Sequence, residues 1–197
     1  MKSHVFPGRL HRVFHAWAAV SCFAVLLLAG WNARSANGIA ATKGETYYTQ
    51  FSLFHEKRAW PITNYRKGLL VSVNTQVTFL KASSKEIVVK LPDGGTLKIV
   101  NIERYSGENI EGVFNCIFGK EKVDLAKFSI AEKENIMAGT VDVGMSKDAV
   151  VKALGYPPKH NWTPNLEGEG NEWRYWKNRY GTMLVSFTDG KVSDIKK

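Results

Sequence analysis

The hydrophobic pattern of this chain changes its period near residue 125, and the change predicts two parts of different architecture. Within residues 69–79, apolar side chains occupy alternate positions, which is typical of a half-buried β-strand. Within residues 150–154, the apolar side chains follow helical spacing instead. We therefore predict an α+β chain with a small β domain at residues 42–125 and a mixed module at residues 126–197.

The first part is expected to fold as a small antiparallel β barrel of the SH3-like kind. Its Asp93-Gly94 step suits the tight turn of a hairpin, because glycine adopts positive φ without strain. The segment Gly68–Val77 resembles the opening strand of bacterial SH3-like domains, where a similar hydrophobic run ends in Asn-Thr or Gly-Thr. The expected strands are Tyr47–Phe54, Leu69–Phe79, Ile87–Leu91, Thr96–Val100 and Val113–Phe118.

The second part shows two helix starts followed by a β meander. Ser129 and Glu132 have the spacing of a capping box, and Gly139 is expected to end that helix. Ser146 is the expected N-cap of a second helix that ends at Gly155. The helices should cover one face of a three-stranded antiparallel sheet. Its expected strands are Glu172–Lys177, Thr182–Thr188 and Lys191–Ile195.

A spaced pattern in residues 128–197 resembles the SmpA/OmlA family, which contains the small lipoprotein subunit of the outer-membrane β-barrel assembly machinery. The resemblance rests on Gly144-Met145-Ser146, Val150, Leu154-Gly155, Pro157, Trp173-x-Tyr175, Leu184-Val185-x-Phe187 and Gly190-x-Val192. It implies an exported Gram-negative envelope protein that acts by binding other envelope proteins, in support of outer-membrane protein assembly or envelope integrity. The same layout occurs in β-lactamase inhibitor proteins, so inhibition of an exported enzyme is a further alternative by fold analogy.

The N-terminal segment, residues 1–36, has the pattern of a signal peptide. A basic start precedes the apolar run Ala16–Gly30, which as a helix spans roughly 22 Å and is shorter than the ~30 Å bilayer core. We expect cleavage between residues 35 and 41, with an uncleaved anchor as the alternative. Trp31 stands where a lipobox would have its cysteine, so a lipoprotein is not expected. The predicted location is periplasmic or secreted, and any membrane contact is peripheral or through the uncleaved segment.

This segment contributes +4 of the chain's net charge of +9. Residues 1–36 contain four basic residues and no acidic residue, so the remaining chain has a net charge of +5. Because no basic run and no nucleic-acid-binding motif appears in it, we do not expect a nucleic-acid partner.

Two clusters of aromatic and basic residues are candidate binding sites. The candidates for a protein partner are Arg174, Trp176, Arg179 and Tyr180, with Trp162 from the preceding loop. Residues of these types dominate protein interfaces. The alternative is a peptidoglycan-, glycan- or peptide-binding loop at Trp60, Tyr65 and Arg66, in which aromatic faces would stack on the ligand. The competing interpretation is that Trp60 and Tyr65 complete the core of the β domain.

No catalytic motif and no metal-ligand spacing is apparent, so neither an enzyme nor a cofactor is expected. The least favoured alternative is a thiol enzyme that uses Cys116 with His55 or His160. We expect Cys116 to be a buried, unreactive thiol between Phe114 and Phe118 of a strand.

Overall fold

The computed structural model describes residues 39–158 and 171–197. The expected signal segment, Trp162 and His160 lie outside the described residues. No helix in the described ranges combines the length and the apolar character needed to cross a membrane. The fold is mixed α+β, which confirms the predicted class.

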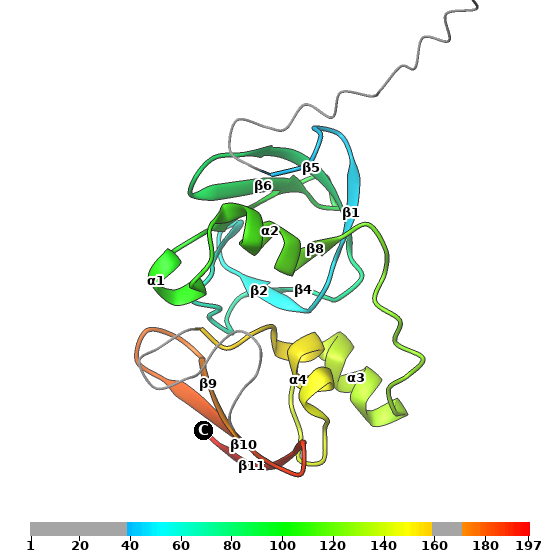
Figure 1. Cartoon of the computed structure of the whole chain (residues 1–197), viewed down its shortest axis with the longest axis vertical. Coiled ribbons are helices and arrows are strands. Elements are labelled where there is room, and N and C mark those ends of the chain that lie inside the picture. Colours follow the sequence, from blue (N-terminus) through cyan, green and yellow to red (C-terminus); the bar gives the residue numbers. More distant parts are fainter. Residues whose placement is uncertain (1–38, 159–170) are drawn as a thin grey trace, which may run out of the picture. The chain divides into compact units, whose positions relative to one another are not determined.

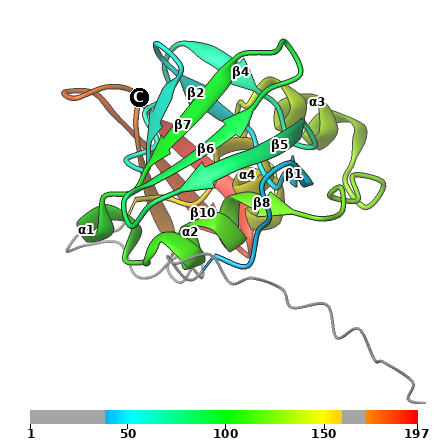
Figure 2. The ribbon, with the colours of Figure 1, turned by 90° about the horizontal axis from the view of Figure 1, so that it is seen from above.

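A six-stranded sheet organises the first part of the chain and curls into a half-barrel (Figure 2). The strand order is β3-β7-β6-β5-β1-β8, and all neighbours are antiparallel except β3 and β7. A separate antiparallel pair consists of β2 (Leu53–His55) and β4 (Leu69–Val71). The strands of the larger sheet are β1 (Thr46–Thr49), β3 (Ala59–Pro61), β5 (Gln76–Ala82), β6 (Glu86–Lys90), β7 (Thr96–Val100) and β8 (Phe118–Gly119).

Local turn chemistry explains where these strands begin and end. The β6–β7 hairpin forms as predicted, and Gly94 has a φ of 82° in its turn. The single strand expected from Leu69 to Phe79 is wrong, because a turn interrupts it and divides it into β4 and β5. Asn74 lies in this turn with a φ of 64°, a conformation that asparagine tolerates better than most residues. Its side chain is held there by hydrogen bonds with the backbone of Val123.

The strand expected at Val113–Phe118 is wrong, because these residues belong mainly to helix α2 (Ile110–Ile117). The buried residues Ile110, Val113, Phe114 and Ile117 recur at helical spacing, so the apolar stripe begins before the segment that looked like a strand. Asn109 caps the helix by accepting a hydrogen bond from Gly112 N at 2.8 Å. A further short helix, α1 (Glu103–Ser106), was not expected.

The second part has the predicted layout of two helices and a three-stranded meander (Figure 1). The antiparallel order is β11-β10-β9, and Asp189 and Gly190 both adopt positive φ in the last turn. Buried side chains of both helices and all three strands form one hydrophobic cluster. The elements are α3 (Ile130–Ala138), α4 (Lys147–Leu154), β9 (Glu172–Trp176), β10 (Thr182–Thr188) and β11 (Lys191–Lys196).

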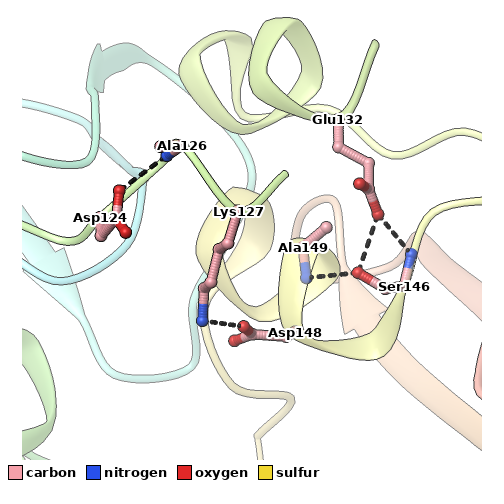
Figure 3. A network of polar contacts seen from close by, with 7 residues as sticks. All are labelled: Asp124, Ala126, Lys127, Glu132, Ser146, Asp148 and Ala149. Atoms are coloured by element: carbon pink, nitrogen blue, oxygen red, sulfur yellow. Dashed lines mark hydrogen bonds and ion pairs between the residues drawn. The ribbon is translucent and has the colours of Figure 1, made fainter. Parts of the chain in front are cut away.

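One carboxylate joins the N-termini of α3 and α4 (Figure 3). Glu132 Oε2 accepts from Ser129 N at 3.0 Å, which completes the predicted capping box. Glu132 Oε1 accepts from Ser146 N at 2.9 Å and from Ser146 Oγ at 2.8 Å. Partial burial disfavours the carboxylate, but these donors outweigh it and lower the pKa of Glu132 from 4.5 to about 2.

The C-termini of the same two helices are capped by side chains from the first part of the chain. Ser52 Oγ donates to the Ile136 carbonyl at 2.7 Å, and Ser72 Oγ donates to the Met137 carbonyl at 2.9 Å. Asn64 Nδ2 donates to the Leu154 carbonyl at 2.6 Å. The last carbonyls of a helix lack the amide donor that the next turn would supply, so these side chains supply donors at both helix ends. The Ile136 carbonyl also accepts from Gly139 N at 3.3 Å.

Replacing Glu132 with glutamine tests the shared cap. The change puts an amide where the carboxylate accepts from both serines, and we expect a loss of about 1–3 kcal/mol of unfolding free energy at pH 7. Because the folded pKa is lowered, the contribution of the carboxylate is present above pH 4.5 and is lost as the pH falls towards about 2. Urea unfolding across this pH range should therefore show a shallower pH dependence in Glu132→Gln than in the parent chain.

Glu134→Gln is the matched control for this prediction. Glu134 is exposed on the same helix and makes no side-chain bond with a described residue, so its variant should keep the parental slope. Equal slopes in all three proteins would contradict the shared cap.

Candidate binding groove

Three segments that are distant in sequence form a groove of about 410 Å³. The first segment follows β3, the second is helix α1 with the residue before it, and the third is the end of β9 with the turn that follows. The lining residues are Pro61, Thr63, Tyr65, Ile102, Arg104, Tyr105, Trp176 and Arg179.

The segment after β3 is fixed in place by hydrogen bonds on both sides of the groove-lining Tyr65. Asn64 adopts a φ of 54° and donates through its side chain to the Leu154 carbonyl. Arg66 N donates to the Trp176 carbonyl at 3.0 Å. Tyr65 is therefore held beside the end of β9, where Trp176 also lines the groove.

The charged residues that line the groove are both arginines. Arg104 lies over the Tyr105 ring at 4.7 Å and Arg179 lies over the Tyr180 ring at 5.8 Å. Neither guanidinium forms an ion pair with a carboxylate of the described residues, and none of the described residues that line the groove is acidic. The local potential is therefore positive, and it favours an anionic ligand.

Thr63 adds a polar atom to the wall of the groove. The residue is only 8% exposed, and its Oγ1 is buried without a hydrogen-bond partner among the described residues. A buried hydroxyl without a partner is unfavourable.

The structure brings together residues from both predicted clusters. Trp176 and Arg179, from the candidates for a protein partner, line the same groove as Tyr65, from the candidates for a glycan or peptide. Arg174 is half-buried on β9, two residues from Trp176, and it does not line the groove. Tyr180 is 87% exposed and also lies outside the lining.

Trp60 is not in a loop as the sequence suggested. It belongs to β3 and is 1% exposed, and its ring lies 6.1 Å from that of Phe51 within the core. Parallel pairing of β3 with β7 extends the sheet to this residue and encloses the indole. The faces of Trp60 are therefore covered by the protein itself.

Arg66 likewise has a structural position. Its guanidinium donates to the carbonyls of Leu154 and Gly139, at the ends of α4 and α3, and lies over the Phe54 ring at 4.7 Å. Burial lowers the pKa of this guanidinium to about 10. Arg66 and Tyr65 are adjacent in sequence, yet Arg66 stabilises two helix ends while Tyr65 lines the groove.

Sequence reasoning missed the contribution of α1. Arg104 and Tyr105 form an adjacent basic and aromatic pair, as do Tyr65-Arg66 and Arg179-Tyr180. This recurrence is a weak signal, because the same adjacency occurs at Lys127-Phe128, which does not line the groove. The pairing alone did not distinguish the residues that line the groove from those that support it.

The thiol lies in a different environment. Cys116 is on α2, not on a strand, and it lines a small apolar cavity of about 30 Å³. Burial raises the pKa of Cys116 to about 12, which disfavours the nucleophilic thiolate. Burial also lowers the pKa of His55, which is 4% exposed and belongs to β2. Within residues 39–158 and 171–197, no group of three or more His, Cys, Asp and Glu side chains could hold a metal ion.

Comparisons with protein-family models, curated proteins and solved structures found no match for this chain.

Native Cys116 should react slowly with a thiol reagent at pH 7.5. Its raised pKa leaves little thiolate, and burial restricts access, so we expect labelling at least about 100-fold slower than in urea-unfolded protein. Labelling is followed by mass spectrometry so that adducts at Cys116 and Cys22 are counted separately. Rapid native labelling of Cys116 would revive a role as nucleophile.

Arg66→Lys tests the structural role of the guanidinium. A lysine keeps the charge but cannot present a planar fork to two carbonyls, so we expect a loss of about 1–3 kcal/mol of unfolding free energy. Arg58→Lys is the matched control, because Arg58 forms a partly exposed ion pair with Asp93 at 2.8 Å and should cost less than about 1 kcal/mol. The measurement is chemical denaturation at pH 7, and equal losses in the two variants would contradict this role.

Proposed function

We propose that this chain is an exported, non-catalytic binding protein of the Gram-negative envelope, which docks partner proteins in support of outer-membrane protein assembly or envelope integrity. The observation that carries the proposal is the groove in which Tyr65, Tyr105 and Trp176 occur with two arginines that have no carboxylate partner among the described residues.

The envelope part of the proposal rests on sequence. The N-terminal pattern of residues 1–36 is that of a signal peptide, which directs the chain to the periplasm or outside the cell. The SmpA/OmlA resemblance of residues 128–197 points to the same compartment. The two-helix, three-strand layout of the described residues is the layout that this resemblance leads one to expect.

The binding part rests on the composition of the groove. Trp, Tyr and Arg are the residues that contribute most often to binding energy at protein interfaces. Aromatic rings bury a large area with few rotatable bonds, and arginine pairs with carboxylates in a fixed geometry. A groove of about 410 Å³ has room for a few side chains of a partner.

Binding of peptidoglycan or another glycan is the second candidate. Tyr65 favours it, because this residue of the originally expected glycan site does line the groove. An SH3-like relationship of residues 42–125 would strengthen this candidate, and it remains a proposal. The burial of Trp60 and the structural bonds of Arg66 leave Tyr65 as its main support.

A thiol enzyme is the least favoured alternative. The raised pKa of Cys116, which is only partly exposed on α2, does not suit a nucleophile.

Photocrosslinking in intact cells tests the proposed function. The full chain would be expressed in its host with a photoreactive phenylalanine analogue in place of Trp176, or in place of Gln76 as an exposed control on β5. We expect adducts with one or a few envelope proteins from position 176 and none from position 76, identified by mass spectrometry. Equal adducts from both positions, or adducts with peptidoglycan alone, would contradict a protein-docking groove.

A further inference from the structure

We infer that the groove binds an acidic peptide segment of the partner, with the peptide carboxylates on Arg104 and Arg179 and its apolar side chains against Tyr65, Tyr105 and Trp176. The inference rests on the proposed function and deepens it, because it names the chemistry that the groove would recognise.

The polarity of the lining residues favours an anion. A guanidinium is a hydrogen-bond donor and never an acceptor, while an ionised carboxylate is an acceptor and never a donor. Arg104 and Arg179 supply donors from two different segments, and neither forms an ion pair with a carboxylate of the described residues. Two separated arginines match a ligand with two carboxylates better than a ligand with one.

The apolar walls favour a ligand that also has a hydrophobic surface. Tyr65, Tyr105 and Trp176 are all half-buried, so each ring is partly covered by the fold and partly open. Pro61 and Ile102 extend this apolar surface. A free inorganic anion has no apolar surface that could pack against these walls, whereas a peptide places acidic and apolar side chains within a few ångströms of each other.

A neutral glycan fits the groove less well. Sugar hydroxyls donate as well as accept, and a site for them needs acceptors such as carboxylate or amide oxygens. Among the described residues that line the groove there is no Asp, Glu, Asn or Gln side chain.

Both arginines are exposed, which makes them suitable for mutation. Arg104 lies on the short helix α1, and Arg179 lies in the turn after β9. Their contacts are with the rings of the adjacent tyrosines and do not cap any helix. The double variant Arg104→Gln/Arg179→Gln should therefore fold, and its circular dichroism spectrum and melting temperature verify this.

The test uses an array of pentapeptides and the purified full chain. Each peptide alternates Asp or Glu with Phe, Tyr, Leu or Val, and each has a counterpart with Asn or Gln in place of the acidic residues. We expect the full chain to bind a subset of acidic peptides and to bind their amide counterparts at least about tenfold more weakly. The best acidic peptide is then titrated by isothermal calorimetry.

The double variant should weaken binding of that peptide at least about tenfold. The control variant Lys43→Gln/Lys191→Gln removes the same charge outside the groove and should stay within about twofold of the parent chain. Equal binding of acidic and amide peptides, no binding to any peptide, or equal losses in both variants would overturn the inference. Arginine-dependent binding of soluble peptidoglycan fragments in place of peptides would overturn it in favour of a glycan ligand.

The two experiments separate the inference from the proposed function. Envelope-protein adducts at position 176 without acidic-peptide binding would leave the docking function and refute its acidic-peptide chemistry. If neither envelope-protein adducts nor acidic-peptide binding is observed, both the proposed function and the inference are refuted.

Discussion

Capping of the C-termini of α3 and α4 is the interaction on which the rest of this structure depends. Neither helix can satisfy its last carbonyls alone. The partners are Ser52, Ser72, Asn64 and Arg66, all from the first part of the chain. The bonds of Ser52 and Asn64 are buried, so separating the helix ends from the first part would leave those acceptors without donors. Arg66 would also lose the bonds that offset the burial of its charge. The helix ends therefore fix the position of the segment after β3.

The groove is a consequence of that fixed segment. Asn64 and Arg66 are both tied to the end of α4, so Tyr65 between them has little freedom to move. The bond from Arg66 N to the Trp176 carbonyl then places the end of β9 beside it. Hydrogen bonds within the fold hold the segments that carry Tyr65 and Trp176. A ligand that contacts both rings therefore orders fewer side chains, and less conformational entropy is lost on binding.

The sequence predicted those features that depend on neighbouring residues, and it did not predict those that depend on tertiary contacts. The capping box at Ser129, the cap at Ser146 and the Asp-Gly hairpins follow from chemistry within a few residues, and all are confirmed. The sequence predicts a strand in place of helix α2, because the short apolar run from Val113 onward fits both the two-residue period of a strand and the 3.6-residue period of a helix. Trp176, Arg179 and Tyr65 were identified as candidates, but their common groove with α1 requires three distant segments to meet.

Because the groove depends on hydrogen bonds at the helix ends, only substitutions that leave those bonds intact can report on binding. Arg66 resembles a ligand-binding arginine in sequence, yet its loss would disturb two helix ends and move Tyr65 with them. A binding defect in such a variant would confuse stability with recognition. Arg104 and Arg179 bond no helix end, so a defect there would report on the charge of the groove itself. Residues that support the site and residues that recognise a ligand are thus adjacent in sequence, and only their hydrogen bonds distinguish them.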